Sequence, residues 1–176
     1  MLTAEVERLL NEQIVYEMYS ANLYLSMSAW LREKSLDGYA HWFYVQHKEE
    51  MDHVLILFNY VLNAGGQLKL GAVDAPPHEF DSLEAILQQS YEHEQSVTAR
   101  IYAIVEEAQD IRDFKTVQFL DWFIKEQAEE EDNASSNIGR LKTFGGDNMG
   151  LHTLDQEAGA RVYVQTPQLA LVEASA

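Results

Sequence analysis

The sequence predicts an all-α fold: a four-helix bundle with a long crossover between the second and third helices and a short fifth helix. Three observations lead to this prediction. Four long stretches carry apolar residues at steps of three and four, which is the spacing of one helix face. Short turns join the first stretch to the second and the third to the fourth. A longer segment without this spacing separates the second stretch from the third, as a crossover would.

The first helix is predicted over residues 5 to 34 and the second over residues 39 to 64. Residues 35 to 38 form a short turn, and a short connection places two neighbouring helices antiparallel. Gly65 and Gly66 end the second helix, because glycine readily adopts the conformation that follows a helix C-terminus.

Residues 67 to 81 contain Gly71, Pro76 and Pro77 and no helical pattern. An extended chain covers ~3.3 Å per residue, so this segment spans roughly 50 Å, enough to travel the length of a bundle. We therefore expect a crossover, after which the third helix runs parallel to the second.

The third helix is predicted from Ser82, a suitable cap, to a turn at residues 110 to 113. The fourth follows to about Phe144, before Gly145. Residues 1 to 145 are thus predicted to form the four-helix bundle that carries the functional site.

Residues 146 to 176 are predicted to hold a short fifth helix, from about 149 to 160, and an apolar tail from 161 onward. A helix of twelve residues is marginal in isolation. The four-helix body has already closed its core, so we expect this C-terminal part to pack on another subunit and to serve assembly; the alternative is a frayed tail.

Composition and charge narrow the function. With 176 residues and 47% hydrophobic content, the chain is large enough for one domain with a substantial core. The net charge of -17 argues against nucleic acid or an anionic membrane as a partner. The absence of cysteine excludes disulfides and thiolate metal sites. A signal pattern and a long apolar run are both missing, which predicts a cytoplasmic location.

A glutamate interrupts the apolar face of each long helix. At 1.5 Å rise per residue, all four lie at ~18 to 26 Å from one end of the bundle, and therefore at one level. Taken alone, Glu50 with His53 would be an ordinary core histidine bonded to a neighbouring carboxylate. The coincidence on four helices favours a site instead. The four residues are Glu17, Glu50, Glu94 and Glu130.

Four carboxylates in an apolar core, with no lysine or arginine on these faces, require protons or bound cations. His53, Gln127 and Tyr24 lie beside them on the same faces. Oxygen-rich ligation with one imidazole and no thiolate favours iron, manganese or magnesium over copper or structural zinc. The sequence therefore predicts a site for two divalent ions. Tyr24 is expected to donate a hydrogen bond or an electron there; the alternative is that it only packs in the core.

These residues resemble the ferritin family, and specifically the bacterial non-haem ferritins. The resemblance spans nearly the whole chain, including the proline-containing crossover and the short fifth helix. It implies a homo-oligomeric shell of 24 subunits that oxidises Fe(II) with O2 or H2O2 and stores ferric oxyhydroxide. The motifs that carry it are Glu17 with Tyr24, Glu49-Glu50-x-x-His53, Glu94, and Glu126-Gln127-x-Glu129-Glu130.

Carried over residue by residue, the resemblance implies that Glu17, Glu50 and His53 hold a first iron. Glu50 would bridge to a second iron held by Glu94 and Glu130. Gln127 would lie near the pair as a hydrogen-bonding or weakly ligating group. The residues implied for a third iron position, which shares Glu130, are Glu49, Glu126 and Glu129; the alternative for them is an ordinary solvated acidic face.

Two alternatives remain open. A bacterioferritin would bind haem through a methionine on the second helix, and Met51 lies at the matching position. However, bacterioferritins carry a second E-x-x-H motif on the fourth helix, where this chain has Gln127 and Glu130, which favours the non-haem type. The other alternative is a ferritin-like di-iron protein that stores nothing, or a bundle whose acidic centre only binds zinc or magnesium.

Overall fold

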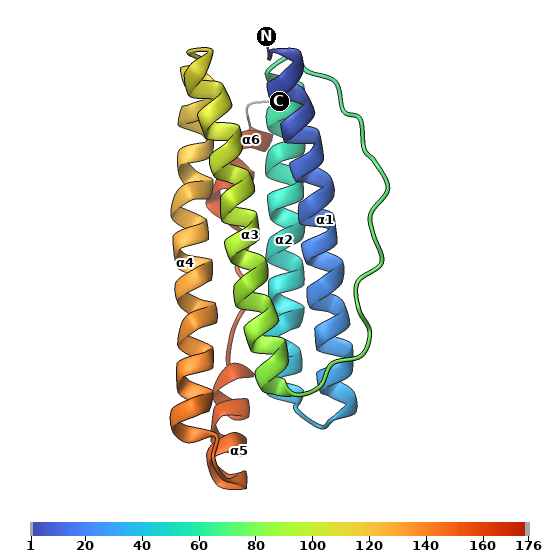
Figure 1. The fold of residues 1–176 in the computed structure, drawn as a ribbon, viewed down its shortest axis with the longest axis vertical. Coiled ribbons are helices and arrows are strands. Elements are labelled where there is room, and N and C mark those ends of the chain that lie inside the picture. The colour runs from blue at the N-terminus through green and yellow to red at the C-terminus, as the bar shows by residue number, and fades with distance from the viewer. Residues whose placement is uncertain (1, 175–176) are drawn as a thin grey trace.

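The structure is a computed structural model that describes residues 2 to 174, except for the side chain of Glu173. These residues form six helices and no strand, and four long helices lie side by side as a bundle (Figure 1). The prediction of an all-α fold is therefore confirmed. None of the described helices is long and apolar enough to cross a membrane.

Helices α1 (Ala4–Glu33) and α2 (Asp37–Asn63) form the first antiparallel hairpin. The Thr3 side chain accepts a hydrogen bond from Val6 N at 3.4 Å, which satisfies one free N–H group in the first turn of α1. Ser35 adopts a left-handed conformation, with a φ of 62°, and turns the chain between the two helices. Both helices lie within two residues of their predicted ranges.

The predicted crossover is present between α2 and α3, and it runs along the side of α1 (Figure 1). Asn11, which is buried on α1, holds the crossover through both ends of its amide group. Its Nδ2 donates to Gln67 O at 2.9 Å, and its Oδ1 accepts from Lys69 N at 2.6 Å. The crossover brings the chain to the far end of the bundle, so α3 runs parallel to α2.

Helices α3 (Leu83–Asp110) and α4 (Phe114–Phe144) form the second antiparallel hairpin. Each begins at a side chain that caps its first turn. Ser82 accepts from Ala85 N at 3.1 Å, and Asp113 accepts from Thr116 N at 3.2 Å. These caps fix where the two helices start and therefore which residues face the other hairpin.

Two shorter helices follow. Helix α5 (Asn148–Ala158) packs against α2 and α4, close to its predicted range, and α6 (Pro167–Glu173) packs against α2. The sequence analysis did not predict α6. Leu169 of α6 is fully buried in the core of its own chain. The role of residues 146 to 176 in assembly, and the division of the chain at residue 145, stay predictions.

The buried apolar side chains form two clusters, one toward each end of the bundle. On α1, the buried residues of one cluster end at Ile14 and those of the other begin at Leu23. Glu17 lies between them. The same gap occurs on α2 and α3, where it contains Glu50 and Glu94. On α4, Glu130 lies between the buried Phe123 of one cluster and the partly buried Ile138 beside the other.

Candidate metal centre

A layer of glutamates fills the gap between the two apolar clusters. One comes from each long helix: Glu17, Glu50, Glu94 and Glu130 are 0%, 2%, 1% and 5% exposed. Because both neighbouring layers are apolar, water cannot compensate these carboxyl groups, and they depend on one another and on the few polar side chains among them.

Glu17, Glu50 and His53 come closest together. Each offers one ligand atom, and these atoms all lie within 4.8 Å of one another. Three buried atoms at this point have no hydrogen-bond partner: Glu17 Oε2, Glu50 Oε2 and His53 Nδ1. A buried polar atom without a partner costs roughly 1 to 3 kcal/mol. Three such atoms converging on one point therefore mark a place for a ligand that binds oxygen and nitrogen.

The remaining oxygens of the inner carboxylates are held by neutral donors. Gln13 Nε2 donates to Glu17 Oε1 at 2.9 Å. Tyr24 OH donates to Glu94 Oε1, and Gln127 Nε2 donates to Glu94 Oε2 at 3.1 Å. These bonds orient the carboxylates without neutralising them. On Glu17 they leave one oxygen bound and one free to bind a cation.

Two residues of this centre were missed by the sequence analysis. Gln13 precedes Glu17 by one helical turn, so an i,i+4 search along α1 would have found it. Gln46 lies one turn before Glu50 on the same face of α2, and its Nε2 donates to Glu130 Oε2 at 2.8 Å. Gln46 therefore connects α2 to α4 at the edge of the layer.

Burial and mutual repulsion change how these carboxyl groups titrate. Burial, and then the charge of Glu50, raises the pKa of Glu17 to about 8. Burial, and then the charge of Glu130, raises the pKa of Glu94 to about 8. Burial and the charges of Glu94 and Glu130 raise the pKa of Glu50 well above its usual value. Without a bound cation, Glu17 and Glu94 therefore retain protons at neutral pH.

His53 is held between aromatic rings on α4. Its ring centroid lies 5.6 Å from that of Trp122 and 5.7 Å from that of Phe123, both in edge-on arrangements. Its Nδ1 lies 3.3 Å from Glu50 Oε2. The aromatic contacts fix the plane of the imidazole, so Nδ1 is directed toward the carboxylates before any ligand arrives.

Three further acidic residues lie outside the buried layer. Glu49 is 22% exposed at its side chain and forms an ion pair with Arg161 at 2.6 Å. Glu126 is half-buried, and burial raises its pKa. Glu129 is exposed. Arg161 was not part of the predicted site, because nothing local in the sequence connects residue 161 to helix α2.

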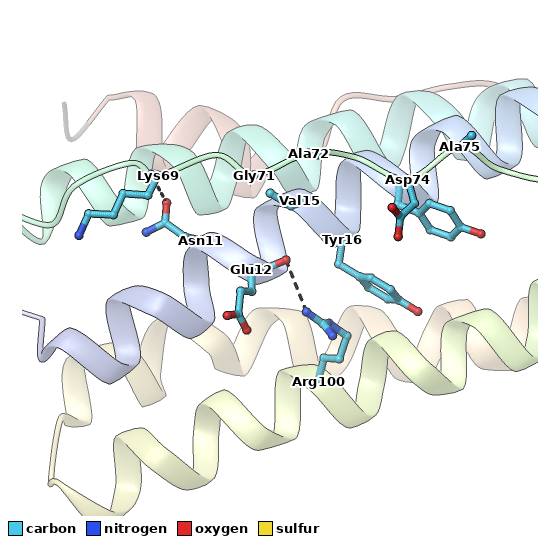
Figure 2. Close-up of a pocket in the computed structure, with 11 residues that line it drawn as sticks. Asn11, Glu12, Val15, Tyr16, Lys69, Gly71, Ala72, Asp74, Ala75 and Arg100 are labelled. Carbon is cyan, nitrogen blue, oxygen red and sulfur yellow. Dashed lines mark hydrogen bonds between the residues drawn. The ribbon is translucent and has the colours of Figure 1, made fainter.

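A cavity of about 720 Å³ lies elsewhere, between α1, the crossover and α3 (Figure 2). Glu12 and Asp74 line it, as do Lys69 and Arg100. The close-up shows Arg100 directed toward the Glu12 backbone. Since acidic and basic side chains balance there, the cavity lacks the uncompensated carboxylates of the buried layer and is a poorer place for a cation.

Carboxylate oxygens with one imidazole nitrogen form a donor set suited to iron and manganese. A family model described as "Ferritin-like domain" matches residues 7–144, which include every residue of the buried layer. The chain belongs to the ferritin family. The resemblance stated from the sequence is thereby confirmed.

Relatives of this ferritin support the non-haem type. The "Probable bacterial non-heme ferritin-like protein" of Haemophilus influenzae is 38% identical, over 90% of this chain and 96% of that protein. The "Bacterial non-heme ferritin" of Campylobacter jejuni is 41% identical, over 89% of this chain and 93% of that protein.

Solved structures agree with the fold of this ferritin. An open-pore ferritin from the archaeon Archaeoglobus fulgidus is 41% identical and has a TM-score of 0.90, over 92% of this chain and 98% of that one. An engineered closed form of the same ferritin has a TM-score of 0.91 at 40% identity, over 93% of this chain and 100% of that one. The ferritin-like bundle with its long crossover is thus confirmed.

Proposed function

We propose that the chain is an iron storage protein with ferroxidase activity. It oxidises Fe(II) with O2 or H2O2 between the four long helices and stores the product as ferric oxyhydroxide inside a shell of 24 identical subunits. One observation carries the proposal: Glu17 Oε2, Glu50 Oε2 and His53 Nδ1 are buried without a hydrogen-bond partner, and the three residues each offer a ligand atom within 4.8 Å of the others. Membership of the ferritin family supplies the choice of iron as the substrate.

The two iron ions occupy the two sides of Glu50. Glu17, Glu50 and His53 bind the first ion through their converging atoms. Glu50, Glu94 and Glu130 bind the second, so Glu50 bridges the pair. In support, the charges of Glu94 and Glu130 are the largest influences on the pKa of Glu50 after burial. Gln127 stays a neutral neighbour that donates to Glu94.

Iron binding replaces protons with metal. The pKa values of Glu17 and Glu94, about 8, mean that both carboxyl groups are mostly protonated at neutral pH until a cation arrives. Two Fe(II) ions then give up one electron each, and the two electrons together with two protons convert O2 to H2O2. The protein contributes the fixed spacing of the carboxylates and an apolar surround that keeps bulk water away.

Tyr24 supports metal binding through its contact with Glu94. It is fully buried, and its hydroxyl donates to Glu94 Oε1. This bond lowers the pKa of Glu94 and so favours the ionised carboxylate that a metal needs. We assign Tyr24 as a hydrogen-bond donor of the centre, placed where it can also deliver an electron to the oxidant.

A third iron position lies beside the pair on the side of α2 and α4. Glu130 is shared between it and the pair, and the other carboxylates come from Glu49, Glu126 and Glu129. In support, burial and then the charges of Glu130 and Glu126 raise the pKa of Glu49, whereas the charge of Arg161 lowers it. The proposal does not include haem. Met51, the alternative haem ligand, is 37% exposed on the surface of α2.

The ferroxidase proposal is tested by adding Fe(II) aerobically to purified protein and recording O2 uptake. We expect rapid uptake and a yellow-brown product. The double substitution Glu50→Ala with His53→Ala removes two of the three converging ligand atoms and should abolish the fast phase while leaving slow mineral growth. Glu106→Gln, an exposed carboxylate on α3, is the control. Unchanged initial rates in the double variant would count against the site.

Assembly is tested separately by size. A storage shell should elute near 24 times the 20.1 kDa subunit mass, whereas a di-iron protein that stores nothing need not form a shell. The same sample, titrated with haem, should give no bound-haem absorption band if the non-haem assignment holds. The cytoplasmic location stays a prediction of the sequence.

A further inference from the structure

The C-terminal strap, residues 159 to 172, returns from α5 to α6 along the bundle (Figure 1). Several contacts fasten it to α2. The Arg161 carbonyl lies 2.8 Å from His41 Nε2. The Tyr163 hydroxyl lies 3.0 and 2.9 Å from the two oxygens of Asp52, which is itself buried. With Leu169 buried in the core at its far end, the strap is anchored on both sides of residue 161.

Arg161 extends from the strap to the outer edge of the glutamate layer. Its Nη2 lies 2.6 Å from Glu49 Oε2, and its Nη1 donates to Gln46 Oε1. Its guanidinium carbon lies 4.2 Å from the centre of the Trp42 ring, a cation–π contact. The guanidinium is thus held on three sides, and only 16% of the side chain is exposed.

Gln46 connects this guanidinium to the buried layer. Its Oε1 accepts from Arg161, while its Nε2 donates to Glu130 Oε2 at 2.8 Å. Glu130 is the residue shared between the iron pair and the third position. The charge of Arg161 also lowers the pKa of Glu49 and of Glu126, two of the four carboxylates of the third position.

We propose that Arg161 is an internal cation that occupies the third position, and that a divalent ion binds there only by displacing it. This inference rests on the proposed function. Arginine keeps its charge at any physiological pH, so it cannot leave by losing a proton. A metal bound to Glu49 Oε2 would approach that oxygen to about 2.0 to 2.2 Å and would face the guanidinium as a like charge. The two cannot share this oxygen.

An order of filling follows from this competition. Glu17 Oε2, Glu50 Oε2 and His53 Nδ1 have no hydrogen-bond partner, so the first position can accept metal without breaking a hydrogen bond. At the second position, metal displaces only neutral donors, which are Tyr24 and Gln127 on Glu94 and Gln46 on Glu130. The third position accepts metal only after the bonds from Arg161 to Glu49 and Gln46 break. Arg161 therefore sets the affinity of the third position and makes it the last of the three to fill.

The experiment uses crystals of the assembled protein soaked in graded concentrations of Zn(II), a redox-inert probe, and measured at the zinc edge. In the wild-type protein we expect the inner positions to fill first, with the third position filling only where the Arg161 side chain has moved away. Arg161→Ala should lower the Zn(II) concentration that half-fills the third position by roughly tenfold or more, because a competing charge is gone. Arg161→Lys should give a half-filling concentration between those of wild type and Arg161→Ala. Lysine keeps the charge but lacks the planar guanidinium that contacts Glu49 and Gln46 together.

Two controls separate this effect from others. Arg8→Ala also removes one positive charge that is paired with two glutamates, but on the exposed face of α1, and should leave the third position unchanged. Glu49→Gln added to Arg161→Ala removes a ligand and should abolish the gain. Together, these two results would show that the gain in Zn(II) affinity comes from the contact between Arg161 and Glu49.

The outcomes distinguish the two proposals. If the inner positions fill and the third has the same affinity in wild type and Arg161→Ala, the role of Arg161 is wrong and the ferroxidase proposal stands. If the inner positions bind no Zn(II) in any variant, the proposed function fails and this inference fails with it. Should Arg161→Ala disturb the strap, Arg161→Lys still allows the Zn(II) affinity of the third position to be compared with that of wild type.

Discussion

The carboxylate of Asp155 caps a helix that begins far away in the sequence. Its Oδ1 accepts a hydrogen bond from Tyr39 N at 2.9 Å, in the first turn of α2, and both groups are buried. Leu36, at the N-cap position of α2 itself, provides no side-chain acceptor. Helix α5 therefore supplies the cap that α2 lacks, and in doing so fixes the point from which the strap starts.

Removing this cap should release α5. Asp155→Ala leaves the Tyr39 N–H without its acceptor, and the loss of a helix cap costs about 1 kcal/mol. We expect faster hydrogen exchange in α5 and in the first turn of α2, with the middle of the bundle unaffected. Gln156→Ala, an exposed neighbour on α5, serves as the control and should exchange like wild type.

Gly38 should be sensitive to the smallest added side chain. A Cβ atom built at Gly38 would lie 1.6 Å from the Asp155 carbonyl oxygen, so Gly38→Ala must push α5 away from α2. Gly139 is the matched control, because a Cβ there meets nothing within 4 Å. Gly139→Ala on α4 should stabilise the protein by about 0.5 to 1 kcal/mol. Proteolysis near residue 147 should accelerate only in Gly38→Ala; equal rates in both variants would contradict the close packing.

The metal-free protein should lose stability as the pH rises. The pKa of Glu17 is about 8 in the folded chain and near 4.5 when unfolded. Between these values the folded state holds a proton that the unfolded state has lost, so the contribution of Glu17 is fully present below pH 4.5 and declines up to about pH 8. Urea midpoints measured with a chelator should therefore fall less steeply with pH in Glu17→Gln than in wild type. Parallel curves would show that Glu17 titrates normally.

His93 makes the stability of the folded chain depend on pH in the opposite direction. This effect cancels when wild type and Glu17→Gln are compared. Burial lowers the pKa of His93 to about 4 from its usual 6.5, so its contribution to stability is lost as the pH falls through that window. His93 is present in both wild type and Glu17→Gln. The difference between their curves therefore excludes His93 and reports Glu17 together with its effect on Glu50 and Glu94.

Tyr24→Phe should weaken metal binding without changing the fold. The variant removes the hydrogen bond to Glu94 Oε1 that favours the ionised carboxylate, while the ring still fills its place in the core. At neutral pH we expect Zn(II) affinity at the inner positions to drop roughly fivefold, the size of one hydrogen bond of about 1 kcal/mol. Calorimetric titration measures this. An unchanged affinity would assign Tyr24 to redox chemistry alone.

Asn11 should anchor the crossover. Its amide makes hydrogen bonds to Glu7 O, Gln67 O and Lys69 N while 4% exposed, so Asn11→Ala leaves backbone groups of the crossover unpaired. We expect a loss of about 2 kcal/mol in the free energy of unfolding. Asn59→Ala, which removes a single bond to its own helix, should change stability by less than about 0.5 kcal/mol.

The long helices and the inner site residues were predictable because their signal is local. Apolar spacing placed each long helix within two residues, and Glu17, Glu50, Glu94 and Glu130 stood out as charges on apolar faces. The structure places all four in one buried layer, although their role in binding iron stays a proposal. Because the bundle buries all four carboxyl groups, a charged residue on an apolar helix face was a sign of a site.

The strap could not be predicted in the same way. Residue 161 lies 112 positions from Glu49, and no pattern in the sequence relates the two. Helix α6 did have a signal that was overlooked: Thr166 caps it, and Pro167 occupies its first turn, where proline is well tolerated. Seven residues are too few to show a periodic apolar pattern, so the capping residues were the local sign of α6.

The crossover divides the buried layer between two halves of the chain. Glu17, Glu50 and His53 belong to the α1–α2 hairpin, whereas Glu94 and Glu130 belong to the α3–α4 hairpin. Each hairpin therefore holds only part of the ligand set that we propose for two metal ions. Under the proposed function, a metal pair bound by this layer connects the two hairpins, so removing the metal should increase the motion of one hairpin relative to the other.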